Sequence, residues 1–204
     1  MTKSKARVAV FISGGGSNLQ SLIDASKSGI LDAEIAWVVS GRRDAFGLER
    51  AAKAGIESFV FKMIRYDTPQ EAGADLFGKL KERKIDYIAL AGYLNLLPSA
   101  VVTAYRNRIV NIHPALLPKY GGKGMYGHHV HEAVIAAGDA ESGVSFHIVD
   151  EVYDNGPVIA QSRVPVQPGD TPETLAARVL ELEHKLYPRV LNKLIKGEYK
   201  LDHE

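Results

Sequence analysis

The chain has 204 residues, of which 46% are hydrophobic and 24% are charged, and its 25 lysines and arginines against 24 aspartates and glutamates give a formal net charge of +1. These values are typical of a soluble globular protein with an ordinary core, and the balanced charge gives no indication of nucleic acid or an anionic membrane as a partner. The sequence contains no cysteine, which excludes disulfides, thiolate catalysis and cysteine-ligated metal sites.

The first half of the chain alternates short apolar runs with amphipathic segments. Strands are predicted at Val8–Ile12, Ile35–Ser40, Ser58–Phe61 and Tyr87–Ala91, and helices from about Leu19 to Gly29, from Ala45 to Ala54 and from Pro69 onward. This alternation indicates an α/β fold with an open, mostly parallel sheet, helices on both faces and a Rossmann-like N-terminal half. The first apolar run is too short for a signal peptide or a spanning helix, so we expect a cytoplasmic protein.

The second half has a different pattern. Ile109–His113 is a predicted strand that Pro114 ends, and Val144–Val149 and Val158–Val166 are predicted strands joined by a turn around Asp154-Asn155-Gly156. This connection indicates an antiparallel extension of the sheet. A long helix is predicted to start at Thr171-Pro172. We see no repeat or linker, so residues 1–204 are expected to form a single domain.

A glycine-rich segment, Ser13-Gly14-Gly15-Gly16-Ser17-Asn18, lies between the first predicted strand and the first predicted helix. Open parallel sheets bind anions here, where backbone N–H groups, a helix N-terminus and the Ser17 hydroxyl can face a phosphate. The segment matches neither the dinucleotide fingerprint nor a Walker loop. It predicts a phosphate site, and the alternative is a tight turn with Ser17 or Asn18 as the helix cap.

Asn111-Ile112-His113-Pro114 places two polar side chains at the end of a predicted strand. Asn111 and His113 project from the same face because side chains alternate along a strand. An amide beside an imidazole is suited to stabilise an oxyanion and to handle a proton near neutral pH. A carboxylate from Asp154 beside His113 would raise the pKa of the histidine. Residue types alone favour a plainer alternative, in which His113 is a hydrogen-bonded edge residue and Asp154 a turn residue.

The remaining histidines do not predict a metal site. His128-His129-Val130-His131 lacks the helical spacing of zinc proteases and lies in a glycine-rich context, so we expect these histidines to be exposed or to line a ligand site. His147 alternates into a predicted strand and is expected to be a hydrogen-bonded core residue rather than a catalyst.

Six segments resemble the glycinamide-ribonucleotide formyltransferase family, and together they cover nearly the whole chain. They are Ile12–Gln20, Asp44–Ala51, Leu90–Tyr93, Asn111–Pro118, Asp154–Ile159 and Glu183–Pro188. No single segment is decisive, but six in the family's order and spacing are very specific. The resemblance implies the formyltransferase fold and transfer of a formyl group from 10-formyltetrahydrofolate, as co-substrate, to the amine of 5′-phosphoribosylglycinamide in purine biosynthesis, without a metal.

The resemblance also implies three groups of site residues. The catalytic residues would be Asn111, His113 and Asp154, and the ribonucleotide would be held by Gly16, Ser17, Asn18 and Glu183. The folate pocket would be lined by Tyr93, Leu94, Asn95, Leu96, Leu97, Asn111, Asp150, Glu151, Val152, Tyr153 and Asp154.

The mechanism that the resemblance implies is direct transfer. The neutral amine attacks the formyl carbon, and Asn111 and protonated His113 donate hydrogen bonds to the tetrahedral oxyanion. Asp154 would keep His113 charged and help to position a water that carries protons to the departing folate nitrogen.

Some positions depart from the commonest family pattern. Many members have Phe-Met-Arg where this chain has Tyr93-Leu94-Asn95, and a second arginine of some relatives aligns with Gln70. The two arginines that would recognise the folate's glutamate tail are therefore absent. Arg65 is an arginine close to Gln70 in the sequence. The loop Lys119–Gly127 is longer and more glycine-rich than in many relatives. We expect it to be a mobile flap over the substrate, and the alternative is a tolerated insertion.

Three other functions remain to be distinguished. Formyltetrahydrofolate hydrolase shares a similar residue set but uses water as acceptor, and its relatives carry an additional N-terminal domain. Methionyl-tRNA formyltransferase usually adds a basic C-terminal domain, and neither addition is expected here. The third alternative is a non-catalytic folate- or nucleotide-binding protein. The expected partners are small-molecule substrates, with no nucleic acid and no membrane, for a monomer or homodimer.

Overall fold

The computed structural model describes residues 4–201, so the expected domain of residues 1–204 has three residues at each end outside the described part. The strands are β1 (Ala6–Ile12), β2 (Ala33–Ser40), β3 (Ser58–Val60), β4 (Tyr87–Leu90), β5 (Ile109–His113), β6 (Glu141–Ile148) and β7 (Val158–Pro165). The helices are α1 (Ser17–Ser28), α2 (Gly47–Lys53), α3 (Pro69–Glu82), α4 (Ser99–Ala104), α5 (His128–Ala136) and α6 (Pro172–Ile195), with a 3₁₀ turn at Met63–Arg65. Within the described range, no helix combines the length and apolarity that crossing a bilayer requires.

All of these strands belong to one sheet, in the order β3-β2-β1-β4-β5-β6-β7. Strands β1 to β5 pair in parallel, and β6 and β7 are added antiparallel at one edge, which confirms the predicted fold class. The direction of strand addition reverses at β1, whose neighbours are β2 and β4. Open sheets bind ligands at the carboxyl ends of the strands where this reversal occurs.

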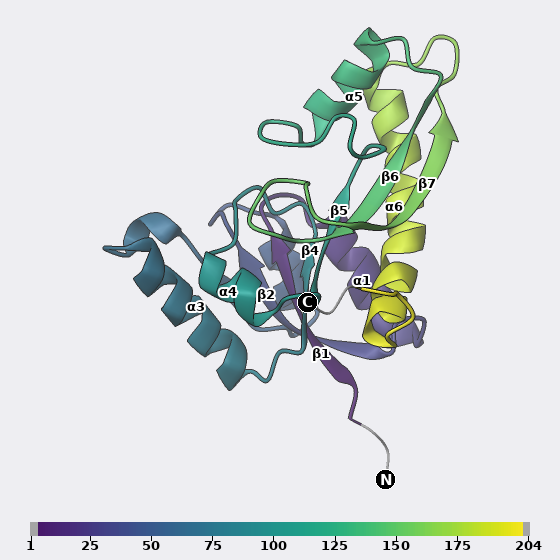
Figure 1. Cartoon of the computed structure of the whole chain (residues 1–204). Coiled ribbons are helices and arrows are strands. Elements are labelled where there is room, and N and C mark those ends of the chain that lie inside the picture. Colours follow the sequence, from purple (N-terminus) through teal and green to yellow (C-terminus); the bar gives the residue numbers. More distant parts are fainter. Residues whose placement is uncertain (1–3, 202–204) are drawn as a thin grey trace.

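The side chains of β1 alternate between two apolar clusters, one on each face of the sheet. Val8, Val10 and Ile12 are fully buried in the cluster that includes side chains of α1 and α6. Ala9 and Phe11 are fully buried in the other cluster, with side chains of α3 and α4. Figure 1 shows α1 and α6 on one side of the sheet and α3 and α4 on the other. Burial on both faces explains why the β1 sequence is continuously apolar.

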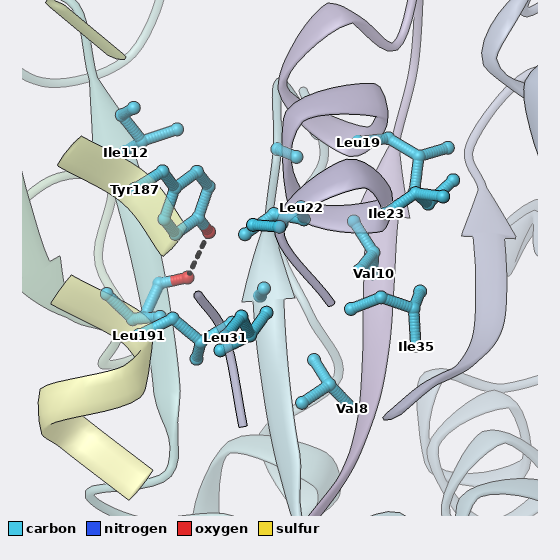
Figure 2. Packing of buried hydrophobic residues seen from close by; sticks show 14 of the residues in the cluster. Val8, Val10, Leu19, Leu22, Ile23, Leu31, Ile35, Ile112, Tyr187 and Leu191 are labelled. Atoms are coloured by element: carbon cyan, nitrogen blue, oxygen red, sulfur yellow. Dashed lines mark hydrogen bonds between the residues drawn. The ribbon is translucent and has the colours of Figure 1, made fainter. Parts of the chain in front are cut away.

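The long helix α6 is fixed to the sheet by a buried tyrosine. The Tyr187 hydroxyl donates hydrogen bonds to the carbonyl oxygens of Leu90 (2.8 Å) and Val110 (3.1 Å). Figure 2 shows the Tyr187 ring among the buried side chains, with this hydroxyl hydrogen-bonded. At the start of the helix, the N-cap residue Thr171 and Thr174 form a reciprocal capping box, and Pro172 is the first helical residue. The predicted N-terminus of this helix is therefore confirmed. The middle of α6 is therefore fixed in position relative to the carboxyl ends of the strands.

The structure corrects three local expectations. Helix α1 begins at Ser17, and its N-cap is Gly16 with no side-chain cap bond, so neither Ser17 nor Asn18 is the cap. Helices α4 and α5 carry no strong periodic signal, because they are only 6 and 9 residues long, and they were not predicted. The segment His128–His131 therefore starts a helix rather than continuing a glycine-rich loop.

Candidate active site

A cavity of about 910 Å³ opens at the carboxyl ends of the central strands. Its walls include the glycine-rich segment after β1, the segment 90–97 after β4, the end of β5, the loop residues 149–154 and one face of α6. This is the position expected for a ligand site at the reversal point of an open sheet, and the volume is within the range of small-molecule sites.

Backbone geometry shapes the glycine-rich segment. Gly16 has φ 69°, and a Cβ at this position would lie 2.6 Å from the Cα of Gly47, so only glycine fits. The carbonyl oxygens of Gly14 and Gly15 accept hydrogen bonds from the Gly47 N–H (3.1 Å) and from Arg50 Nε (2.8 Å). The segment is thereby held against α2, while the first N–H groups of α1 have no intrahelical acceptor. These are the donors that an anion site at a helix N-terminus requires.

Asn18 and Glu183, both expected at the ribonucleotide, line the cavity and contact each other. Asn18 Nδ2 donates a 2.6 Å hydrogen bond to Glu183 Oε2, while Asn18 Oδ1 is buried with no partner among the described residues. Burial raises the pKa of Glu183 to about 7, and the bond from Asn18 acts in the opposite direction. Glu183 is only 7% exposed, so its side chain points inward from α6.

The structure brings the three predicted catalytic residues together around Asp154. One carboxylate oxygen, Oδ2, lies 3.5 Å from His113 Nδ1, and the other, Oδ1, accepts a 3.3 Å hydrogen bond from Asn111 Nδ2. Asp154 has φ 52°, a conformation that aspartate tolerates better than most residues. The turn aspartate is thus directed back at the end of β5, and the sequence-only alternative of an isolated turn residue is wrong.

His147 also belongs to this group, although the sequence predicted only a core residue. It pairs with Asn111 across β5 and β6, and its Nε2 lies 3.0 Å from Asn111 Nδ2 and 3.4 Å from Asp154 Oδ1. Its Nδ1 lies 3.0 Å from the carbonyl oxygen of Ile148 and donates to it. His147 therefore orients the Asn111 amide.

Burial determines the charge state of the catalytic pair. It lowers the pKa of His113, and the charge of Asp154 and the hydrogen bond to the Tyr120 carbonyl only partly oppose it. Asp154 thus raises the pKa of His113 as expected, but burial outweighs this effect in the substrate-free site. For Asp154, burial raises the pKa, but the His147 contact, the charge of His113 and the Gly122 N–H together lower it below its usual range. The resting pair is a carboxylate beside a neutral imidazole.

The base of the loop Lys119–Gly127 is attached to the same two catalytic residues. His113 Nε2 lies 2.8 Å from the Tyr120 carbonyl oxygen, and the Gly122 N–H donates a 3.0 Å hydrogen bond to Asp154 Oδ2. A Cβ at Gly121 would lie 2.7 Å from a Leu117 methyl carbon. Since the rest of the loop, residues 122–127, lines the cavity, the loop forms one of its walls.

Most residues expected at the folate also line the cavity. These are Tyr93, Leu94, Asn95, Leu96, Leu97, Asp150, Val152 and Tyr153, whereas Glu151 is exposed and is not among the lining residues. Burial raises the pKa of Tyr93 to about 12, and a hydrogen bond from Asn95 to its hydroxyl acts in the opposite direction. Asn95 thus replaces the family's arginine with an uncharged partner for Tyr93. Arg65 and Gln70 do not line the cavity, but Arg42 does.

Ser13 of the glycine-rich segment also lines the cavity, as does His131, which belongs to the histidines expected to be exposed or to line a ligand site. Ser13 Oγ accepts a 3.1 Å hydrogen bond from the Leu94 N–H and so links the segments after β1 and β4. His131 is 4% exposed, and its Nδ1 has no partner among residues 4–201. Burial, together with the nearby His128 and His113, lowers the pKa of His131 to about 4. Over the same described range, no group of three or more histidines and carboxylates is arranged to hold a metal ion.

The chain is similar in sequence and fold to known proteins. The formyl transferase family model matches residues 6–191, and the chain belongs to this family. A curated relative from Escherichia coli, phosphoribosylglycinamide formyltransferase, is 40% identical over 95% of this chain and 89% of its own length. The chloroplastic enzyme of the same name from Vigna unguiculata is 43% identical over 95% of this chain, which spans 62% of that relative's length.

Solved structures agree with this assignment. Glycinamide ribonucleotide transformylase 1 from Symbiobacterium toebii superposes with a TM-score of 0.90, at 35% identity over 98% of this chain and 92% of its own. Phosphoribosylglycinamide formyltransferase from Coxiella burnetii, solved with CHES, gives 0.88 at 40% identity, over 97% and 91% of the two chains. The sequence-based resemblance is therefore confirmed at the level of both family and fold.

Proposed function

We propose that this protein transfers the formyl group of 10-formyltetrahydrofolate to the amine of 5′-phosphoribosylglycinamide, giving the formylated ribonucleotide and tetrahydrofolate. The observation that carries the proposal is the convergence of Asn111, His113 and Asp154 in a cavity that also contains a phosphate-type loop. The relatives reported above have the same activity in their names.

Two sides of the cavity match the two substrates. The glycine-rich segment, the N-terminus of α1 and the Asn18–Glu183 pair offer backbone donors for a phosphate and a carboxylate for sugar hydroxyls. Residues 93–97 and 149–154 offer apolar surface and backbone groups for a flat, partly polar pterin. The reacting amine and formyl group then meet between these sides, at Asn111, His113 and Asp154.

In the reaction, the lone pair of the neutral amine forms a bond to the formyl carbon, and the carbonyl oxygen becomes an oxyanion. Asn111 and His113 donate to this oxygen in place of the contacts that Asn111 Nδ2 makes with Asp154 Oδ1 and His113 Nε2 makes with the Tyr120 carbonyl oxygen in the substrate-free site. Because the resting imidazole is neutral, the developing negative charge adds to that of Asp154 and raises the pKa of His113 towards the charged form. The attacking nitrogen becomes positively charged as it bonds to the formyl carbon, and it supplies the proton that His113 takes up as the oxyanion forms.

Collapse of the tetrahedral intermediate breaks the bond between the formyl carbon and the folate nitrogen. The attacking amine loses a proton, and the departing folate nitrogen gains one. Asp154, with its low pKa, is a carboxylate that can orient a water for this transfer.

The test is an assay with purified protein, glycinamide ribonucleotide and 10-formyl-5,8-dideazafolate, in which absorbance follows loss of the formyl group. Turnover that requires the ribonucleotide supports the transferase. Turnover in a mixture without the ribonucleotide would replace it with a hydrolase. Folate binding without turnover in either mixture would replace it with a binding protein.

We further propose that the protein acts in the cytoplasm on small molecules alone, as a monomer or homodimer. The near-neutral net charge supports the absence of a nucleic-acid partner. Light scattering of the purified chain measures the oligomeric state, and an electrophoretic shift with transfer RNA would contradict the small-molecule assignment.

A further inference from the structure

The cavity contains a lysine that the proposed mechanism does not use. Among the lysines and arginines of residues 4–201, only Arg42 and Lys123 line it. The guanidinium of Arg42 is bound to Asp44 through two hydrogen bonds, of 3.0 Å and 2.6 Å. Lys123 is exposed and makes no hydrogen bond or ion pair with any described residue. It is therefore the available positive charge at this site.

Lys123 is placed by a loop that is fixed on both sides of it. The preceding residue, Gly122, donates its N–H to Asp154 Oδ2 at 3.0 Å. Towards the other end of the loop, His128 Nε2 lies 3.4 Å from Glu173 Oε1, so the start of α5 is held against α6. Gly122 and Gly124 have φ values of 96° and 90°, which side chains other than glycine rarely adopt. The backbone is thus shaped to carry one long cationic side chain between the catalytic residues and α6.

The ribonucleotide side of the cavity has backbone donors but no cation of its own. The face of α6 that lines it presents Ala176, Ala177, Leu180 and Glu183. The glycine-rich segment contributes N–H groups and the Ser17 hydroxyl. A phosphate ester carries between one and two negative charges near neutral pH and is bound best by backbone donors combined with a cation.

We propose that Lys123 contacts the phosphate of the ribonucleotide substrate from its position in the loop Lys119–Gly127. The inference rests on the proposed function for the identity of the substrate, but its chemical content is recognition of a sugar phosphate. Lys119, at the start of the same loop, has a different role, because its Nζ binds both carboxylate oxygens of Asp139 (2.7 and 2.6 Å) outside the cavity. Lys119 is therefore the matched control for a lysine of the same loop.

The experiment compares the whole wild-type chain with Lys123→Ala, Lys123→Arg and Lys119→Ala. Calorimetry measures binding of ribose 5-phosphate, and steady-state assays measure KM for each substrate separately. Loss of a charge-assisted contact is expected to weaken ribose 5-phosphate binding and to raise KM for the ribonucleotide by about tenfold in Lys123→Ala. The value of kcat should stay within about twofold if the contact is equally strong in the ground and transition states. Lys123→Arg should restore most of the affinity, and Lys119→Ala should match the wild type.

Three results would overturn the inference. Unchanged ribose 5-phosphate affinity in Lys123→Ala would show that this lysine does not contact the phosphate. A higher KM for the folate co-substrate alone would assign the lysine to the folate's carboxylates. Equal losses in Lys119→Ala and Lys123→Ala would indicate a general effect on the loop. Because sugar-phosphate binding is measured without turnover, an inactive wild-type protein would contradict the proposed function while the binding comparison still decides the role of Lys123.

Discussion

Asn18 and Glu183 lie 165 positions apart in the sequence, yet Asn18 Nδ2 and Glu183 Oε2 are 2.6 Å apart beside the cavity. This bond joins the first turn of α1 to the middle of α6. The carboxyl group is buried, so it is held uncharged or hydrogen-bonded until a polar ligand arrives.

Glu183→Gln should change how the stability of the fold depends on pH. The folded-state pKa of about 7 lies above the ordinary value of 4.5, so the fold favours the uncharged form. The stabilisation is complete below pH 4.5 and is lost as pH rises through 7, by up to about 3 kcal/mol. Glu183→Gln lacks this change. Urea unfolding of both proteins from pH 4.5 to 8 should show the wild type losing stability relative to the variant, and parallel curves would contradict the burial argument.

His131 should give a pH dependence of opposite sign. Its folded-state pKa of about 4 lies below the ordinary 6.5, so the fold favours the neutral ring. Stability is therefore lost as pH falls from 6.5 through 4, again by up to about 3 kcal/mol. His131→Gln should not lose this stability at low pH. The unfolding free energy of the wild type should therefore fall steadily relative to that of the variant below pH 6.5. A difference that stays constant with pH would show that His131 is protonated in the folded protein.

The third prediction separates catalysis from binding. His113→Ala removes one donor to the oxyanion, and kcat should fall about 10²- to 10³-fold. A folate analogue should bind with unchanged affinity, as measured by calorimetry. His129→Ala is the control, because the His129 side chain is 62% exposed, does not line the cavity, and forms its ion pair with Glu132 on the surface of α5. Equal activity of His113→Ala and the wild type would remove His113 from the mechanism.

Gly16→Ala should destabilise the protein because the new methyl group would lie 2.6 Å from a backbone atom, at a positive φ. The left-handed conformation alone costs about 1–2 kcal/mol for a residue with a side chain, and the close contact adds to this. Gly78→Ala, within α3, meets no atom within 4 Å and should stabilise by up to about 1 kcal/mol. Thermal unfolding of the two variants should therefore shift in opposite directions, and a matching shift would contradict the steric account.

The sequence predicted the features that depend on local pattern. Continuous apolar runs indicated β1, β2 and β4, because strands buried on both faces need no polar alternation. The alternation of Asn111 and His113 before Pro114 placed both side chains at the end of one strand, as the structure confirms. Thr171-Pro172 located the start of α6 to the residue.

Local sequence pattern did not predict features that depend on the register between paired strands or on how deeply a side chain is buried. The position of His147 beside Asn111 follows from the pairing of β5 with β6, which single-strand alternation does not specify. The lowered pKa of His113 in the substrate-free site was not predicted, because the partner carboxylate is visible in the sequence whereas the depth of burial is not. Helix α5 is short and follows a glycine-rich segment, so the sequence has no periodic pattern from which the burial of His131 could be predicted.

The cavity wall contains residues from Ser13 to Glu183, supplied by loops after four parallel strands, by the loop after an antiparallel strand and by the last helix. No contiguous fragment of the chain contains both ends of this set. Turnover therefore reports on the integrity of the entire tertiary structure, in the way that circular dichroism reports on helices. A chain with native strands but with α6 undocked would lose Glu183 and the Tyr187 anchor together, and it would be silent in an activity assay while still having much of its secondary structure.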